Sequence, residues 1–217
     1  MRNSLLLVFS ICFTSFLYSQ EKVVTIDPEG IIIEEVTNGK IENNIFICNL
    51  FDWKIAIPEG FKVTELKTAE ELQNKGYTFI KNNVPEGTVV HSAPPILIGF
   101  ERNKYNYFSS SYESLKGDKK VTLEEHKNFS VQLLTNTYIK IKELKSEIKA
   151  SNLKLGPRQF YKITIRLYNA KNDRLVLTQE IYNTFINNHL FSASINYTNE
   201  ITGMLLYYSL KKSFETN

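Results

Sequence analysis

The chain has 217 residues, of which 42% are hydrophobic and 23% are charged, and its formal net charge is +3. This length suits one domain with its own core, and the ordinary composition excludes a disordered, collagenous or coiled-coil chain. Two cysteines are too few for a disulfide scaffold. Only five of the 26 basic residues are arginines and no dense basic run occurs, so a nucleic-acid-binding protein is disfavoured.

The N-terminus has the features of a secretory signal peptide over residues 1–19. Arg2 supplies the positive charge, an apolar run follows up to Leu17, and Ser19 is a small residue at the expected cleavage point. The apolar run is shorter than the roughly 20 residues that a membrane-spanning helix needs. We therefore expect an exported protein with no integral membrane segment, in the periplasm, outside the cell or associated with the outer membrane. An uncleaved N-terminal anchor is the alternative.

Cys48 would be the only cysteine left after cleavage, because Cys12 lies inside the signal peptide. A single cysteine cannot form an intramolecular disulfide. Cys48 lies in an alternating apolar strand, which predicts a buried and inert thiol. A reactive thiol is the alternative, but no histidine, arginine or helix start adjoins Cys48 in sequence to lower its pKa.

The mature chain is expected to begin with an extended lead-in over residues 20–43, which can add an edge strand, and to continue as a globular domain over 44–217. Two short strands are predicted at 45–48 and 53–57, with a turn over 49–52. The segment after the second strand continues extended.

A capping box at residues 68–71 predicts a short helix to around Gly76 or slightly beyond. Prolines and a glycine mark 84–95 as a loop. An apolar strand is predicted at 96–101, and its antiparallel return over 105–112.

A second capping box at residues 122–125 opens the longest predicted helix, about 123–144. Apolar residues at spacings of three and four put one face of this helix against the core: Val131, Leu134, Tyr138 and Ile141. A final helix is predicted over 199–214, and its apolar residues form a stripe: Ile201, Leu205 and Tyr208.

Between these two helices three strands are predicted, at 158–168, 174–186 and 190–197. The first alternates cleanly between apolar and polar residues, which is typical of an antiparallel sheet covered on one face. Asn187-Asn188 is a plausible two-residue hairpin turn, because asparagine tolerates the left-handed conformation. The order of elements predicts a single α+β domain with helices packed on a twisted antiparallel sheet.

Three segments resemble PsbP-like domains over residues 44–215. The strand at 53–57 with the following Pro-Glu-Gly-Phe resembles the opening of that family, and the helix from Thr122, the turn at Gly156 and the strand from Phe160 are similar to its centre. Residues 190–197 and the final helix resemble its end. The resemblance implies an α/β/α sandwich, shared with the yeast Ran-binding import factor and DcrB-type periplasmic proteins. It also implies binding or assembly of proteins rather than catalysis, and it transfers no partner, cofactor or metal site.

The sequence has no recognisable catalytic or metal-binding motif. His91, His126 and His189 lack the spacings of a zinc site, and there is no calcium loop, nucleophile elbow or phosphate loop. His126 falls in the first turn of the capped helix, so a surface or capping role is expected. We expect no catalytic residue, no cofactor and no metal.

Tyrosines crowd the strand at 105–112. Exposed tyrosines beside a sheet edge suit contact with a protein or a glycan, so Tyr105, Tyr107 and Tyr112 are the candidate binding residues. The alternative is that alternate tyrosines pack against the helices. The sequence as a whole favours an exported, non-catalytic module that binds another envelope or secreted protein. A small-molecule or lipid carrier, with a pocket between the sheet and the long helix, is the second hypothesis, and an enzyme the third.

Overall fold

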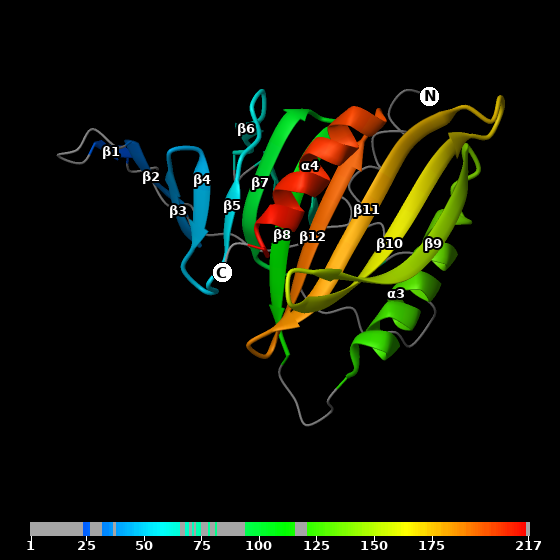
Figure 1. The fold of residues 1–217 in the computed structure, drawn as a ribbon. Helices are drawn as coiled ribbons and strands as arrows, with labels where there is room; N and C mark the ends of the chain where they lie inside the picture. The colour runs from blue at the N-terminus through cyan, green and yellow to red at the C-terminus, as the bar shows by residue number, and fades with distance from the viewer. Residues whose placement is uncertain are drawn as a thin grey trace.

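The computed structural model describes single positions between residues 68 and 81 and the following ranges: 24–26, 32–36, 38–65, 94–115 and 121–215. The described strands form two antiparallel sheets, and the helices α3 and α4 pack on the larger one (Figure 1). The predicted signal peptide, most of the loop at 84–95 and His91 lie outside the described residues. The α+β class predicted from the order of elements is confirmed.

The larger sheet has seven strands, and every neighbouring pair in it is antiparallel. In spatial order they are β6 (Lys62–Val63), β7 (Ile96–Asn103), β8 (Asn106–Ser114), β12 (His189–Tyr197), β11 (Leu175–Ile186), β10 (Arg158–Asn169) and β9 (Leu144–Leu155). The hairpin between β11 and β12 turns at Asn187 and Asn188, whose φ angles of 47° and 60° confirm the predicted left-handed turn.

The smaller sheet runs in chain order through β1 (Val24–Ile26), β2 (Ile32–Val36), β3 (Gly39–Glu42), β4 (Ile45–Cys48) and β5 (Lys54–Ala56). The predicted strands β4 and β5 and the turn between them are confirmed. The lead-in contributes β1, β2 and β3, and so builds most of a sheet rather than one edge strand. Cys48 is buried, as predicted, and burial raises the pKa of its thiol.

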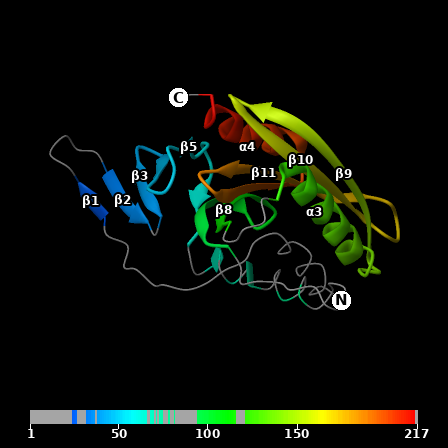
Figure 2. The ribbon, with the colours of Figure 1, turned by 90° about the horizontal axis from the view of Figure 1, so that it is seen from below.

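Helices α3 (Leu123–Tyr138) and α4 (Glu200–Lys212) lie on opposite faces of the larger sheet. On one face, Ile163 and Ile165 of β10 pack in the same core as Leu134 and Tyr138 of α3. On the other, strand β12 packs against α4 through a second core that includes Phe191, Ala193, Leu206 and Leu210. Figure 2 shows the strands running between α4 and α3.

The smaller sheet closes over the α4 side of the larger one through Trp53. Its indole ring lies edge-on to Phe191, with 5.0 Å between the ring centroids, and its Nε1 donates to Ser213 Oγ at 2.9 Å. Both faces of β12 are therefore buried. The sequence predicted a sheet that is covered on one face only. This holds only at β10, farther from the centre of the sheet, where Lys162 and Arg166 stay partly exposed on the α4 side.

The longest predicted helix is six residues too long. Helix α3 begins as expected, with both hydrogen bonds of the Thr122–Glu125 capping box present, but it ends at Tyr138 rather than Leu144. Residues 144–155 form β9, which pairs with β10 over twelve consecutive residues. This ladder outweighs the local helix preference of a segment rich in lysine, leucine and glutamate, because strand pairing and burial routinely override intrinsic propensity.

The capping box predicted at residues 68–71 is also wrong. Thr68 is itself helical, and the Ala69 N–H donates to the Glu65 carbonyl at 2.9 Å, so the helical turn begins before Thr68. Thr68 therefore does not cap the start of this helix. The predicted end near Gly76 lies outside the described residues.

Candidate functional site

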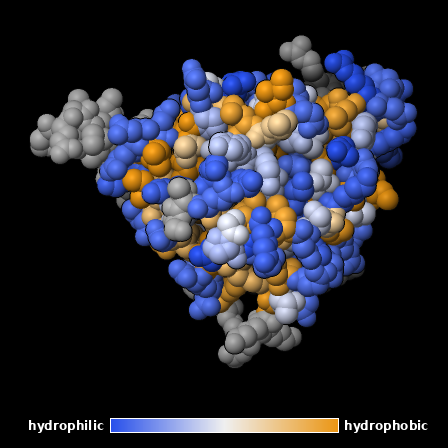
Figure 3. All heavy atoms as spheres, viewed as in Figure 1, coloured by the Kyte–Doolittle hydropathy of each residue, from blue (hydrophilic) through white to orange (hydrophobic). Residues whose placement is uncertain are grey.

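The outer face of helix α4 exposes a continuous row of large apolar side chains. Exposed fractions are 80% for Ile201, 68% for Met204, 38% for Leu205 and 59% for Tyr208. Positions three, four and seven residues apart lie on one side of a helix, so these four form one surface, the α4 row. The apolar stripe predicted on this helix therefore faces solvent. Figure 3 shows hydrophobic side chains among polar ones on this side of the molecule.

Small side chains explain why α4 turns its large residues outward. A Cβ atom on Gly203 would lie 2.7–2.8 Å from the Tyr197 ring, and Ser209 Oγ donates to the Ala56 carbonyl of β5. Thr202, Gly203 and Ser209 thus let the helix backbone lie close to both sheets, with Leu206 and Leu210 filling the remaining space. Met204 completes the exposed row and was not predicted. It lies three residues after Ile201 and four before Tyr208, and this spacing is the signal by which the sequence could have identified it.

Charges of opposite sign flank the α4 row. Glu200 lies in the first turn of the helix, and Lys211 and Lys212 lie in its last turn. Glu215 is 3.4 Å from Lys211 and 3.0 Å from Lys212, so one carboxylate faces two ammonium groups. The row therefore has an acidic end and an end with a surplus positive charge.

The three candidate tyrosines do not form one surface. Tyr105 lies in the turn before β8 and is partly buried against the core on the α3 side, and Tyr107 lies two residues later, in β8. Tyr112 points to the opposite face, where its ring centroid lies 5.9 Å from that of Phe51 and 5.7 Å from that of His189. Burial raises the pKa of Tyr112. The structure thus separates Tyr112 from the other two, and their role in binding stays a prediction.

His126 is not the surface residue that its place in the first turn predicted. Its Nδ1 lies 2.6 Å from the hydroxyl oxygen of Tyr161 on β10, and Ser130 Oγ lies 3.3 Å from the same oxygen. Burial raises the pKa of Tyr161 far above its ordinary range, so the phenol stays protonated and is able to donate a hydrogen bond to a neutral His126. The cluster fixes α3 on the sheet.

Burial also lowers the pKa of His126, which makes folding sensitive to mild acid. The unfolded chain gains this proton near pH 6.5, whereas the folded chain resists it. The contribution of His126 should therefore be complete above pH 6.5 and decline as the pH falls below it. We expect the midpoint of urea unfolding, followed by Trp53 fluorescence, to drop between pH 7.5 and pH 5.5.

A matched variant, His126→Gln, should show a nearly constant midpoint over the same range, because glutamine does not titrate. Ion pairs and capping lower the pKa values of several glutamates. These groups change the stability only near and below pH 4.5, their ordinary pKa, and so do not obscure the range from pH 7.5 to pH 5.5. An equal drop in the variant would show that His126 is not the responsible group.

Neither a metal centre nor a membrane span is found in the part of the chain that the structure describes. No group of three histidine, cysteine, aspartate or glutamate side chains there could hold a metal ion. No helix among those residues is long and apolar enough to cross a bilayer.

No family model and no curated protein matches the chain. The relation to the yeast Ran-binding import factor and to DcrB-type proteins stays a prediction. Among solved structures, the chain is similar to the solution structure of cyanobacterial PsbP (CyanoP) from Synechocystis sp. PCC 6803. The two share 11% identical residues at a TM-score of 0.44, and the match covers 75% of this chain and 82% of that chain.

Proposed function

We propose that this protein is an exported, non-catalytic module that binds another envelope or secreted protein through the α4 row. The observation that carries the proposal is the exposure of four large apolar side chains on one helix face. Contiguous apolar surface of this kind marks interaction sites, because covering it stabilises a complex by about 25 cal/mol per Å². Export rests on the signal peptide predicted from the sequence of residues 1–19.

The charges around the α4 row point to an amphipathic helix of the partner as the occupant. A partner helix that runs antiparallel to α4 would place an acidic residue near Lys211 and Lys212 and a basic residue near Glu200. Such complementarity fixes orientation and suppresses wrong partners more than it adds affinity. Its apolar side chains would fit between those of α4, as in other helix-mediated complexes.

The carrier hypothesis receives less support from the described residues. The space between α3 and the sheet, where a ligand pocket was expected, is filled by fully or nearly fully buried side chains: Leu134, Tyr138, Tyr161, Ile163, Ile165 and Leu167.

The placement of α3 and α4 on opposite faces also supports the α/β/α sandwich that the sequence resemblance implies.

The substitution Met204→Glu should abolish partner binding without unfolding the protein. It puts a charge at the centre of the α4 row, where covering it would carry a large desolvation cost. We expect the amount of partner recovered with tagged protein after carbodiimide cross-linking in the native envelope to fall at least tenfold. This reagent joins lysines to carboxylates, so the cross-links should map to Lys211 or Lys212 and to an acidic residue of a partner helix.

The matched control is Phe129→Glu, which places the same charge on the outside of α3, where the native side chain is 53% exposed. This variant should keep the partner. Retention of the partner by Met204→Glu would contradict the proposal. A purified protein that sediments as a dimer, and as a monomer after Met204→Glu, would show that a second copy of the chain occupies the row instead.

A further inference from the structure

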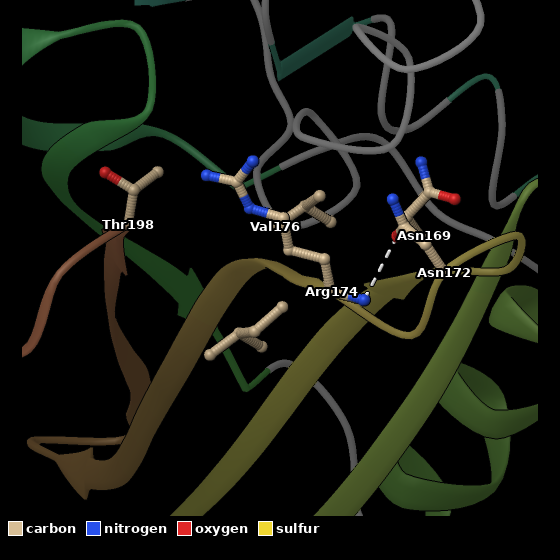
Figure 4. A pocket seen from close by; sticks show the side chains of 6 residues that line it. Asn169, Asn172, Arg174, Val176 and Thr198 are labelled. Atoms are coloured by element: carbon tan, nitrogen blue, oxygen red, sulfur yellow. Dashed lines mark hydrogen bonds between the residues drawn. The ribbon is translucent and has the colours of Figure 1, made fainter.

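A surface cavity of about 340 Å³ lies where β10 ends and β11 begins, close to the end of β12. No residue of the α4 row lines it, and it plays no part in the proposed function. Six residues line it: Asn169, Asn172, Arg174, Leu175, Val176 and Thr198 (Figure 4).

The two asparagines present hydrogen-bond donors to this cavity. Asn169 Oδ1 accepts from the Lys171 N–H at 2.9 Å, and Asn172 Oδ1 accepts from the Arg174 N–H at 3.2 Å. A backbone N–H can only donate, so these bonds fix the carboxamide oxygens toward the backbone. The Nδ2 groups of both side chains have no acceptor among the described residues and are left as donors.

Arg174 adds an unpaired positive charge. Its guanidinium forms no ion pair with a described residue, and its neighbour Asp173 is already paired with Lys145 at 2.6 Å. In Figure 4 the guanidinium lies between Thr198 and the two asparagines. A guanidinium presents several N–H donors in one plane, which match the two oxygens of a carboxylate.

Leu175 and Val176 give the same cavity an apolar part. Leu175 is exposed, although most leucines are buried. We propose that the cavity binds a small organic carboxylate, with its charged group at Arg174, Asn169 and Asn172 and a short apolar chain against Leu175 and Val176. Inorganic phosphate would satisfy the donors but leave the apolar surface uncovered.

Titration of the full chain with hexanoate, followed by NMR of the side-chain N–H groups, tests this assignment. Signals of the Asn169 and Asn172 amides and of Arg174 Nε should shift together and saturate. Arg174→Gln should raise the Kd about tenfold or more, since hydrogen bonds to charged groups contribute about 1.5–3 kcal/mol. The control Arg158→Gln removes an exposed arginine from the opposite end of β10 and should leave the Kd unchanged.

Two further probes separate the contribution of the ligand's charge from that of its alkyl chain. Hexanol lacks the carboxylate and inorganic phosphate lacks the chain, so both should bind more weakly than hexanoate. The assignment is overturned if hexanoate does not shift these three side chains, if hexanol binds as tightly, or if Arg174→Gln has no larger effect than Arg158→Gln. None of these outcomes decides the role of the α4 row, because none of its four residues lines the cavity.

Discussion

Replacing Gly203 by alanine should lower the free energy of unfolding by about 2 kcal/mol, although alanine is the better helix former. The new Cβ atom would lie 2.7–2.8 Å from three atoms of the buried Tyr197 ring, closer than carbon atoms pack. Overpacking of this kind costs about 3 kcal/mol, and the gain in helix propensity returns only about 1 kcal/mol. Urea unfolding followed by the fluorescence of the single tryptophan measures the difference.

Met204→Ala is the matched control for this substitution, because it changes the next residue on the outer face of the same helix. A surface change of this type should stay within about 0.5 kcal/mol. Equal stability of Gly203→Ala and the native protein would mean that α4 does not lie against Tyr197. The orientation of the α4 row, and with it the proposed binding surface, would then be wrong.

The inward face of α4 shows why the sequence predicted this helix but not its orientation. Apolar periodicity identifies Ile201, Leu205 and Tyr208 as one side of a helix, and a core-facing side is usually the more apolar one. Here the core-facing side has small residues where the Tyr197 ring and the Ala56 carbonyl leave no room for larger ones, and only Leu206 and Leu210 are large. Both groups are remote in sequence or belong to another element, so no local pattern contains them.

Strand β9 was missed for a related reason. Its alternation is blurred, since only Leu144 and Leu155 at its two ends are fully buried, and its residue types also suit a helix. What makes it a strand is pairing with β10, a neighbour in space. By contrast, the turn at Asn187-Asn188 and the cap at Thr122 were predicted correctly, because their hydrogen bonds and dihedral angles involve residues at most three apart.

For the candidate sites, too, the sequence predicted local features but not contacts between distant elements. The clustering of Tyr105, Tyr107 and Tyr112 in sequence did not predict that Tyr105 would pack against one core and Tyr112 against the other. The turn chemistry of residues 169–174 is readable from the asparagines, but the cavity beside Arg174 also needs Thr198 from the end of another strand. Local signals thus identified turns and caps, while the surfaces depend on contacts between elements.

Trp53→Ala should have the largest effect of any single substitution considered for this chain, a loss of about 3–5 kcal/mol. The side chain is buried between the two sheets, and its ring contacts Phe46, Phe191 and Phe214 with centroid distances of 6.0, 5.0 and 6.3 Å. Truncation would leave a cavity at the point where the smaller sheet meets α4. Because the fluorescent probe is lost, circular dichroism in urea measures the change.

Ser213→Ala separates the hydrogen bond from the packing of the ring. It removes the acceptor of the Trp53 Nε1–H and keeps the indole, so it should cost only about 1–3 kcal/mol, the penalty of an unsatisfied buried donor.

Hydrogen exchange shows which strands Trp53→Ala destabilises. Faster exchange in β4 and β5, with β10 and β11 still protected, is expected if Trp53 holds the smaller sheet on the larger one. Equal loss of protection in all four strands would show instead that the two sheets unfold as one unit, since the cavity would then weaken every strand alike.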